Sequence, residues 1–401
     1  MTGDRRIFYA AAFLRAVSTS LTGVLMGVYL ARLAITGAAL GGIISAGLAG
    51  SAAAAVVATL FADRWGRRHF LLAVTALSVL GAAAFALTDS AWGLGAAAFV
   101  GMLNGMGRDR GAALILEQAV LPSTTIAAER TRVIAWYNML QDCGHAVGAL
   151  CAGLPALLAT TTPLRGTDTH RAAFFLCAGL GICVFLLYTR LGPNVEAEHR
   201  GRPAPLTARS RHLLIRISAL FAVDSLAGGF LTTALLSYFF FARFGASEAT
   251  IGGLFFGARI LNAGSHLAAA WLARRIGLVN TMVFTHIPSS LLLVTVAFAP
   301  SFTVAAVLFL LREGLVEMDV PTRQSYVLAV VEPNERTVAS GVTNLVRVAA
   351  WAVAPPFASL LMHGNSMGIP LAIGAAMKIS YDLLLLRAFR GIRPPEEQTG
   401  A

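Results

Sequence analysis

The sequence predicts an all-α polytopic membrane protein, with twelve transmembrane helices in two pseudo-symmetric six-helix bundles. Three observations lead to this prediction: an apolar composition, long apolar runs separated by short charged loops, and a repeat at a constant offset. Hydrophobic residues make up 57% of the 401 residues and charged residues only 13%, about half the charged fraction of soluble domains. We therefore expect the membrane interior, rather than a water-excluded globular core, to surround most of the chain.

The apolar runs define the predicted spans. Each is long enough to cross the hydrocarbon of a bilayer as an α-helix, which takes about 20 residues. The first run is too long for the core of a signal peptide and has a counterpart later in the chain, so we expect it in the mature protein. The predicted spans are residues 7–31, 36–62, 70–87, 91–120, 132–159, 172–191, 213–242, 250–273, 278–299, 302–331, 337–362 and 369–389.

Arginine placement predicts the orientation of these spans. With the N-terminus inside, the outer loops contain only Arg32, Arg165, Arg171 and Arg243, whereas the cytoplasmic loops contain 16 arginines. Positive residues accumulate on the cytoplasmic side, so we expect a multi-pass protein of the cytoplasmic (inner) membrane with both termini in the cytoplasm. The net charge of +11 is then explained by topology and by contacts with anionic lipids. Nucleic acid is not expected as a partner.

The two halves of the chain are related at an offset of 211 residues, which brings Gly41-Gly42 onto Gly252-Gly253. Other pairs at this offset are Ala31 and Ala242, Arg32 and Arg243, Ala62 and Ala273, Arg64 and Arg275, and Gly66 and Gly277. The polar stretch 191–212 lies between the halves, and we expect it to be a flexible cytoplasmic linker. The predicted domains are a bundle at 1–190, a bundle at 213–390 and a cytoplasmic tail at 391–401.

A charged loop connects the second and third spans and reads Asp63-Arg64-Trp65-Gly66-Arg67-Arg68. Its connection is so short that the two helices must be antiparallel neighbours, and Gly66 allows the chain to turn there. This pattern resembles the signature loop of the major facilitator superfamily, with Thr59 where the family usually has a glycine. The stretch Glu117-Gln118-Ala119 and the residues after it are similar to a prokaryotic branch of that superfamily, to which we attach no substrate.

The resemblance implies a secondary transporter with the major facilitator fold. In that family the substrate site lies between the two halves near mid-membrane, and the first, fourth, seventh and tenth spans line it. The implied partners are a small-molecule substrate, the lipid bilayer and a proton, and the implied state is a monomer. No phosphate-binding loop, metal-ligand spacing or catalytic triad is evident in the sequence, so we expect no cofactor, no metal and no enzymatic activity.

Charged residues inside the predicted spans are the candidate functional residues, because an embedded charge costs about 2.5–3.5 kcal/mol at mid-helix unless it meets a partner or water. Guanidinium groups match carboxylate and phosphate geometry, which suggests that Arg15, Arg312 and Arg347 bind an anionic group. The expected substrate-binding set is Arg15, Asn138, Arg259, Arg312 and Arg347. Carboxyl groups in low dielectric and histidines can carry protons, and the expected proton-coupling set is Asp142, His145, Asp224 and Glu313.

A cytoplasmic gate is expected around the charged loop. We predict that Glu117 pairs with Arg67 and closes this side when the outward-facing state forms. On the last span, Lys378 and Asp382 are four residues apart and are predicted to pair with each other. The expected gate residues are Asp63, Arg64, Gly66, Arg67, Arg68, Asp109 and Glu117.

The leading functional hypothesis is proton-coupled export of a small organic solute, with uptake of an organic anion by symport or facilitated diffusion as the alternative. A non-transporting membrane sensor on the same fold is a third hypothesis. The embedded charges also have a purely structural explanation as permanent pairs between helices. Two sequence patterns of drug–proton antiporters are missing, because the fifth-span glycine–proline motif is displaced and Gly101 stands where those proteins carry an arginine.

Overall fold

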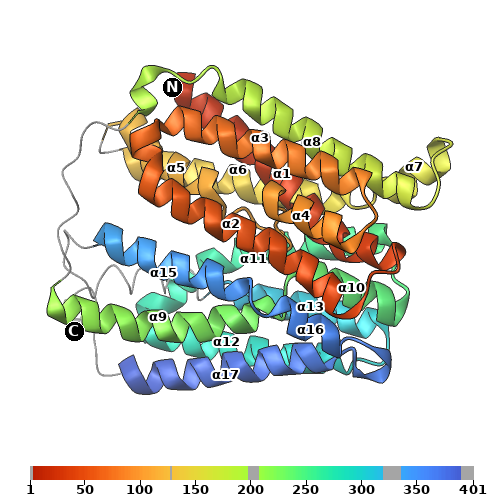
Figure 1. Ribbon diagram of the computed structural model, residues 1–401. Helices are drawn as coiled ribbons and strands as arrows, with labels where there is room; N and C mark the ends of the chain where they lie inside the picture. Colours follow the sequence, from red (N-terminus) through yellow and green to blue (C-terminus); the bar gives the residue numbers. More distant parts are fainter. Residues whose placement is uncertain (1–2, 127–128, 197–206, 319–335, 390–401) are drawn as a thin grey trace. The chain divides into compact units, whose positions relative to one another are not determined.

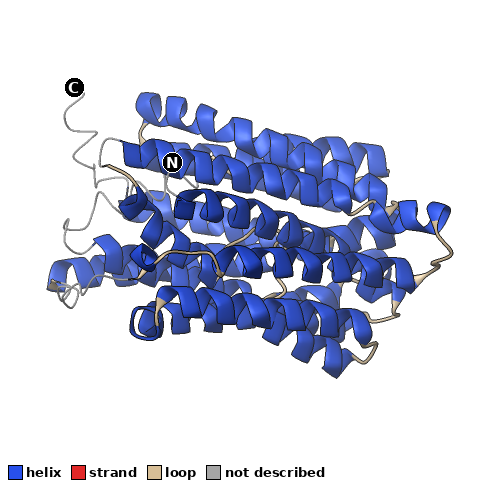
Figure 2. Cartoon of the chain, turned by 90° about the horizontal axis from the view of Figure 1, so that it is seen from above, coloured by secondary structure: helices blue, strands red, loops and turns tan. Residues whose placement is uncertain are grey.

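The computed structural model describes residues 3–126, 129–196, 207–318 and 336–389. Regular structure within these residues is helical throughout (Figures 1 and 2). The helices of the first half are α1 (Gly3–Arg32), α2 (Gly37–Trp65), α3 (Arg67–Leu87), α4 (Ala91–Gly101), α5 (Ala112–Val120), η1 (Leu121–Thr124), α6 (Arg130–Cys151), α7 (Leu154–Thr161) and α8 (Thr167–Tyr188), with η3 (Pro193–Val195) after them. Those of the second half are α9 (Ala208–Gly229), α10 (Thr233–Phe244), α11 (Glu248–Ile276), α12 (Leu278–Ala297), α13 (Phe302–Val316), α15 (Arg336–Trp351), α16 (Pro355–Leu361), η4 (Gly364–Ser366) and α17 (Ile369–Phe389).

Every predicted span contains helix in its described residues. Among the described helices, eight are long and apolar enough to cross a membrane, or nine when α6 and α7, which meet at a bend of 43°, count as one span. The fourth predicted span is instead two short helices, α4 and α5. The eighth, α11, is long enough but carries polar residues such as Arg259 and Asn262, and α13 has only 15 residues.

The chain forms two compact units. The first unit consists of residues 1–200, 232–256 and 355–360, and the second of residues 201–231, 257–354 and 361–401. The first unit therefore combines the first six predicted spans with short parts of the seventh, eighth and eleventh. The division into bundles at 191–212 stays a prediction.

In the first unit, α1 is the central helix and packs against α6, α8 and α10 (Figure 1). Its contact with α6 depends on two glycines. A Cβ atom at Gly144 would lie 2.6 Å from the carbonyl oxygen of Phe13, and one at Gly148 would lie 2.2 Å from that of Val17. Small residues at a helix interface allow this close approach in lipid, where helix association depends on van der Waals packing.

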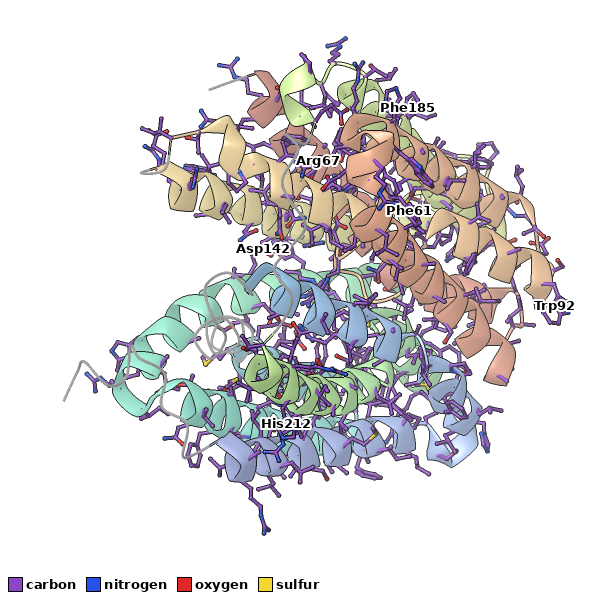
Figure 3. The ribbon with its side chains drawn as sticks, turned by 60° about the vertical axis from the view of Figure 1, so that its left-hand side comes forward. Phe61, Arg67, Trp92, Asp142, Phe185 and His212 are labelled. Carbon is purple, nitrogen blue, oxygen red and sulfur yellow. The ribbon has the colours of Figure 1, made fainter. Side chains whose placement is uncertain are left out.

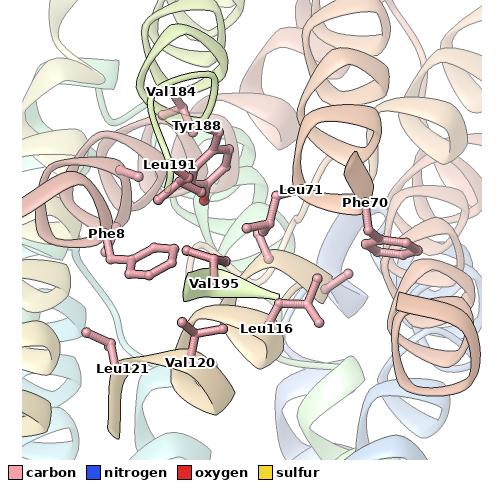
Figure 4. Packing of buried hydrophobic residues seen from close by; sticks show 14 of the residues in the cluster. Phe8, Phe70, Leu71, Leu116, Val120, Leu121, Val184, Tyr188, Leu191 and Val195 are labelled. Carbon is pink, nitrogen blue, oxygen red and sulfur yellow. The ribbon is translucent and has the colours of Figure 1, made fainter. Parts of the chain in front are cut away.

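A hydrophobic cluster closes the end of the first unit that is predicted to be cytoplasmic (Figure 4). Phe8 of α1, Leu116 of α5 and Tyr188 of α8 are among its fully or nearly fully buried members. The first residues of the predicted linker also belong to it, because Leu191 and Val195 are 3% and 1% exposed. Residues 191–196 are therefore packed on this unit, which corrects the expectation of a flexible linker for that part; residues 197–206 lie outside the described part.

Exposed aromatic residues mark both ends of α3. Trp65, the last residue of α2, is 60% exposed, and Trp92, in the first turn of α4 beyond the other end of α3, is 92% exposed. Figure 3 shows Trp92 projecting from its helix far from Arg67. Tryptophan is favoured at the headgroup level of a bilayer, so this spacing fits a span between the two residues.

The turns of the two halves agree at the repeat offset. Gly66 and Gly277 have φ angles of +89° and +85°, and Ala34 and Gly245 have φ angles of +57° and +63°. Positive φ favours glycine because it has no Cβ atom. The turn predicted at Gly66 is confirmed, and its counterpart in the second half has a similar φ angle.

In the second unit, α9 packs against α15 and α17, and α12 packs against α13 and α17. One buried cluster joins these helices. It includes Phe221 of α9, Met282 of α12, Ala339 of α15 and Tyr381 of α17. Several ionisable side chains are buried beside this cluster and are described below.

Candidate functional site

The fourth span is interrupted at the centre of the first unit. Helix α4 ends at Gly101, Met102 adopts a left-handed conformation with φ +52°, and α5 begins only at Ala112 (Figure 1). Non-helical backbone at membrane depth is tolerated only where it is buried in protein or lines a water-filled cavity. The segment 102–111 must therefore obtain hydrogen-bond partners from its surroundings.

Side chains supply many of these partners. Asn104 acts on both sides of the turn, since its Nδ2 donates to the carbonyl oxygen of Arg108 at 2.7 Å and its Oδ1 accepts from the backbone N–H of Met106 at 2.8 Å. Ser51 of α2 donates to the carbonyl oxygen of Met102 at 3.1 Å. The backbone N–H of Asp109 donates to Nε2 of His145 at 2.9 Å. Specific hydrogen bonds from side chains therefore hold the backbone of the break.

Helix α10 completes the break. The backbone N–H of Ala234, in the first turn of α10, donates to the carbonyl oxygen of Gly105 at 3.0 Å. The hydroxyl of Thr233 donates to the carbonyl oxygen of Met106 at 2.7 Å. Gly107 has φ +66°, and a Cβ atom there would lie 2.9 Å from the Thr233 hydroxyl. An N–H that α10 itself cannot satisfy is therefore satisfied by the broken span.

A cavity of about 100 Å³ lies beside the break, within the first unit. Helices α1, α2, α3 and α8 contribute to its wall together with the break. Its polar lining consists mainly of hydroxyl groups, with one amide, one carboxylate and one guanidinium group. These lining residues are Arg15, Ser18, Thr19, Ser51, Thr75, Ser78, Asn104 and Asp109.

Arg15 connects the cavity to a buried ionic cluster. Its Nε donates to Asp109 Oδ2 at 3.0 Å, and its two terminal nitrogens donate to Glu117 Oε1 and Oε2 at 2.8 and 2.7 Å. Glu117 is completely buried and also accepts from the hydroxyls of Tyr137 and Tyr188, each at 2.6 Å. The Arg15 guanidinium is therefore shared by Asp109 and Glu117, and the Glu117 carboxylate accepts hydrogen bonds from four donor atoms.

The hydrophobic cluster of Figure 4 surrounds the Glu117 end of this network, because Tyr137 and Tyr188 belong to both and Leu116, next to Glu117 in the chain, belongs to the cluster. In surroundings of low dielectric, charge pairs interact strongly and an unpaired charge is costly. The ionic network is therefore strongly bonded, and loss of any one charge would leave another unpaired in a buried site.

A second ionic group lies at the opposite end of the first unit. Glu248, just before the predicted eighth span, accepts from Arg32 at 2.9 Å and lies 3.3 Å from Nε2 of His170. Burial raises the pKa of the Glu248 carboxyl, but hydrogen bonds from His170, its own backbone N–H and Arg32, with the charge of Arg32, lower it to about 2. We call Arg32, His170 and Glu248 the outer latch, since it joins α1, α8 and α11.

The second unit places its candidate residues on several helices. Arg312 of α13 is bonded to Glu313, whose other carboxylate oxygen accepts from Asn262 of α11 at 3.0 Å. Arg347 of α15 lies over the ring of Trp351 at 5.0 Å. Arg259 of α11 is also buried.

The predicted pair between Lys378 and Asp382 is wrong. Lys378 Nζ donates to Asp224 Oδ1 at 2.8 Å, whereas Asp382 is bonded to His286. Lys378 and Asp382 are one turn apart on α17, but each has a closer partner on another helix. His286 was missed by sequence reasoning, although a histidine within the apolar run 278–299 was a signal that could have found it.

Three of the predicted substrate-binding and proton-coupling residues, Asn138, Asp142 and His145, lie on α6. His145 is buried and bonded to the break, as described above. Asp142 is half-buried, and Asn138 is exposed. The structure thus brings Arg15, Asp109, Glu117 and His145 together in the first unit.

Comparison with known proteins identifies the family. The family model described as Major Facilitator Superfamily matches residues 8–355. The chain belongs to the major facilitator superfamily. It is also 26% identical over 423 residues to the uncharacterized membrane protein YJR124C of Saccharomyces cerevisiae, covering 97% of this chain and 94% of that protein.

Solved structures of major facilitator transporters share the fold. The nucleoside transporter NupG superposes with a TM-score of 0.72 at 13% identity, covering 97% of this chain and 100% of that one. A bacterial homolog of the human lysosomal transporter Spinster gives 0.74 at 15% identity, with 97% of both chains covered. The xylose transporter XylE from E. coli gives 0.72 at 13% identity, with 98% of both covered. The fold prediction is confirmed, and family and fold together indicate a membrane transporter.

The signature loop of the superfamily is held within the first unit. Asp63 accepts from Arg67 Nε at 2.7 Å. The backbone N–H groups of Arg67 and Arg68, at the start of α3, donate to the two carboxylate oxygens of Glu196 at 2.6 and 3.3 Å. A carboxylate at a helix N-terminus is a favourable arrangement, and sequence reasoning missed it because Glu196 was placed in a flexible linker.

Two predicted gate residues have partners other than the loop in this structure of the major facilitator protein. The predicted pair between Glu117 and Arg67 is not formed, because Glu117 is bonded to Arg15 and to two tyrosines. Asp109 is likewise bonded to Arg15. Both acids therefore lie in the buried network in this structure, and their role in a cytoplasmic gate stays a prediction.

Proposed function

We propose that the protein is a secondary active transporter that exports a small organic solute across the cytoplasmic membrane by alternating access, in exchange for protons. The observation that carries this proposal is the polar cavity beside the broken fourth span, with the Arg15 cluster in its wall. Broken helices at membrane depth are a feature of transporter binding sites. Membership of the major facilitator superfamily supports transport as the activity.

The cavity lining supports a small, hydroxyl- or carbonyl-bearing solute. Serine, threonine and asparagine side chains dominate its polar wall, and they offer both donors and acceptors. The volume of about 100 Å³ suits a small polar group better than a bulky drug-like molecule. The absence of the sequence patterns of drug antiporters points in the same direction.

The shared guanidinium supports exchange with protons. Asp109 and Glu117 are both paired with Arg15. A proton that binds one of these carboxylates and a hydrogen-bond donor of a guest therefore compete for the same carboxylate. Competition for one acceptor makes binding of proton and guest alternate, as an antiporter requires. An inward proton gradient would then drive the solute outward.

Uptake of an organic anion by symport is the second candidate. It is favoured by the buried arginines of the second unit, Arg259, Arg312 and Arg347, since guanidinium groups match carboxylate geometry. In that case a proton and the anion would bind together and move in the same direction.

The sign of the pH gradient separates these candidates. Purified protein in proteoliposomes would be offered radiolabelled polyols, amino acids and dicarboxylates that first raise its melting temperature. Export by exchange predicts accumulation when the lumen is more acidic, and symport predicts accumulation when the outer medium is more acidic. Asp109→Asn and Glu117→Gln are expected to lose the dependence on pH gradient, whereas the exposed-site control Asp168→Asn keeps it.

Two results would contradict the proposal. Transport by the unmodified protein that does not respond to a pH gradient of either sign would remove proton coupling. A cellular phenotype that survives Arg15→Ala and Arg312→Ala but is lost in variants of the loop 63–68 would indicate a non-transporting membrane sensor.

A further inference from the structure

Four ionisable side chains form a continuous chain inside the second unit. Asp224 of α9 accepts from Lys378 of α17 at 2.8 Å, Lys378 Nζ lies 3.3 Å from His286 Nε2 on α12, and His286 Nδ1 lies 3.0 Å from both carboxylate oxygens of Asp382 on α17. All four residues are buried, with exposed fractions from 0% for Asp382 to 8% for Lys378. The chain joins three helices, and nothing in the family resemblance pointed to His286 or Asp382.

One tautomer of His286 satisfies every bond in this chain. A lysine ammonium has only donors, so His286 Nε2 must accept from Lys378. The proton of a neutral imidazole then lies on Nδ1, from which it is donated to Asp382. In this state two carboxylates share one ammonium, through a neutral ring.

A proton added to His286 Nε2 rearranges the chain. The imidazolium and Asp382 become an ion pair, and Lys378 and Asp224 form a second ion pair, so each carboxylate has its own cation. Buried charges are stable when they are paired and costly when they are not. The bond from Lys378 to His286 is lost because both atoms then carry hydrogens, which disconnects α12 from the α9 side of the chain.

We propose that His286, held between Lys378 and Asp382, is a proton-binding site of this protein. The ligand is a single proton taken from water, and its binding replaces the bond between Lys378 and His286 by two separate ion pairs. The site acts on the contact between α12 and α17 and on that between α9 and α17. Its use in coupling rests on the proposed exchange function, whereas its existence does not.

Other charged groups on the neighbouring helices set the field at this site. Helix α13, which packs on α12, carries Arg312 and Glu313, bonded to each other. Helix α15, which packs on α9, carries Arg347 against Trp351. The charged groups acting on Asp382 are His286, Asp224 and Lys378. The charges that act on Asp382 thus include the other three members of the chain.

Nitrogen NMR of the histidine rings tests the proposal directly. Full-length protein labelled with ¹⁵N-histidine, of which the chain has 8, would be titrated with acid in lipid nanodiscs. The resonances lost in His286→Asn are expected to show a neutral ring protonated on Nδ1 at alkaline pH, which becomes doubly protonated on acidification. The exposed His212 on α9 is the matched control, since His212→Asn should leave these resonances unchanged.

Lys378→Met provides a second assignment if His286→Asn does not fold. Removal of the donor to Nε2 is expected to move the His286 resonances and allow the other tautomer. A His286 ring that carries its proton on Nε2 at alkaline pH, or one that does not change protonation between about pH 5 and 9, would overturn the site.

Transport then separates the site from the function. Gradient-driven transport that persists unchanged in His286→Asn would refute the coupling role of this site and leave exchange itself standing. A titrating His286 in a protein whose transport ignores the pH gradient would support the proton site and refute the exchange function.

Discussion

Arg15 holds two carboxylates that belong to the broken fourth span. Asp109 belongs to the non-helical segment, and Glu117 belongs to α5. Because both acids depend on the same guanidinium, a change at any of the three is felt by the other two. Tyr137 and Tyr188 extend this dependence to α6 and α8.

Substitution of Glu117 should therefore be costly. Glu117→Ala leaves Arg15 with only one carboxylate partner and leaves two tyrosine hydroxyls without an acceptor, and we expect a loss of roughly 3–5 kcal/mol of stability. Glu117→Gln keeps the shape and some of the bonds, so its loss should be smaller. Thermal unfolding in detergent, followed by intrinsic fluorescence, measures both. The exposed Glu129→Gln is the control, and a midpoint for Glu117→Ala equal to that of the control would contradict the role of the cluster.

The sequence identified this cluster only in part. The embedded charges at Arg15, Asp109 and Glu117 were evident, because charged residues are rare in apolar runs. Their partners were not, because the contacts join residues 94 to 102 positions apart in the chain. Pairing at such separations is decided by tertiary packing, which local patterns do not record.

At the scale of elements, the outer latch connects the start of α11 to α1 and α8. The side chain of Arg32 is 47% exposed, whereas the side chains of His170 and Glu248 are almost completely buried, at 4% and 8% exposed. Burial of the acceptor makes the latch less sensitive to salt than a surface ion pair. It is therefore expected to hold at physiological ionic strength.

The latch should be stable through neutral pH. Because the pKa of Glu248 is lowered from 4.5 to about 2, ionised Glu248 stabilises the folded state above about pH 5, and this stabilisation disappears as the pH falls toward 2. The difference in melting temperature between the unmodified protein and Glu248→Gln is expected to be constant from pH 8 to about 5 and to shrink below. A difference that varies between pH 6 and 8 would instead place the titration on His170. Asp89→Asn, which removes the exposed partner of Arg171, is the control.

The fourth span shows where element prediction failed. Its hydropathy predicted one continuous helix over 91–120. The structure uses residues 102–111 as a turn, because side chains of α2 and α6 and the first turn of α10 supply partners for its backbone. Hydropathy reports the depth of a segment in the membrane, but it does not report whether neighbours can replace helical hydrogen bonds.

At the scale of the whole molecule, the repeat predicts equivalent behaviour at equivalent turns. Gly66 and Gly277 have φ angles near +90°, so an alanine at either position is expected to cost about 1–3 kcal/mol in backbone strain. Gly264, on α11 with open space around its Cα, is the matched control, and Gly264→Ala should not be destabilising. Thermal unfolding of the three variants measures this. Loss at Gly66 without loss at Gly277 would show that the two turns are not equivalent.

Most of the architecture was predictable because membrane proteins impose simple constraints. Twelve spans followed from hydropathy, and every one contains helix in its described residues. The family followed from the loop at 63–68 and is confirmed. Orientation, the division into bundles and the prokaryotic branch stay predictions.

The bond between Ala234 of α10 and Gly105 of the broken span has a consequence for hydration. Hydrocarbon offers no replacement for this donor and acceptor, so any state in which α10 leaves the break must admit water there. Each such departure would expose the Ala234 amide to solvent. Deuterium uptake at the Ala234 amide would therefore report how often water reaches the contact between α10 and the break, whatever molecule the protein carries.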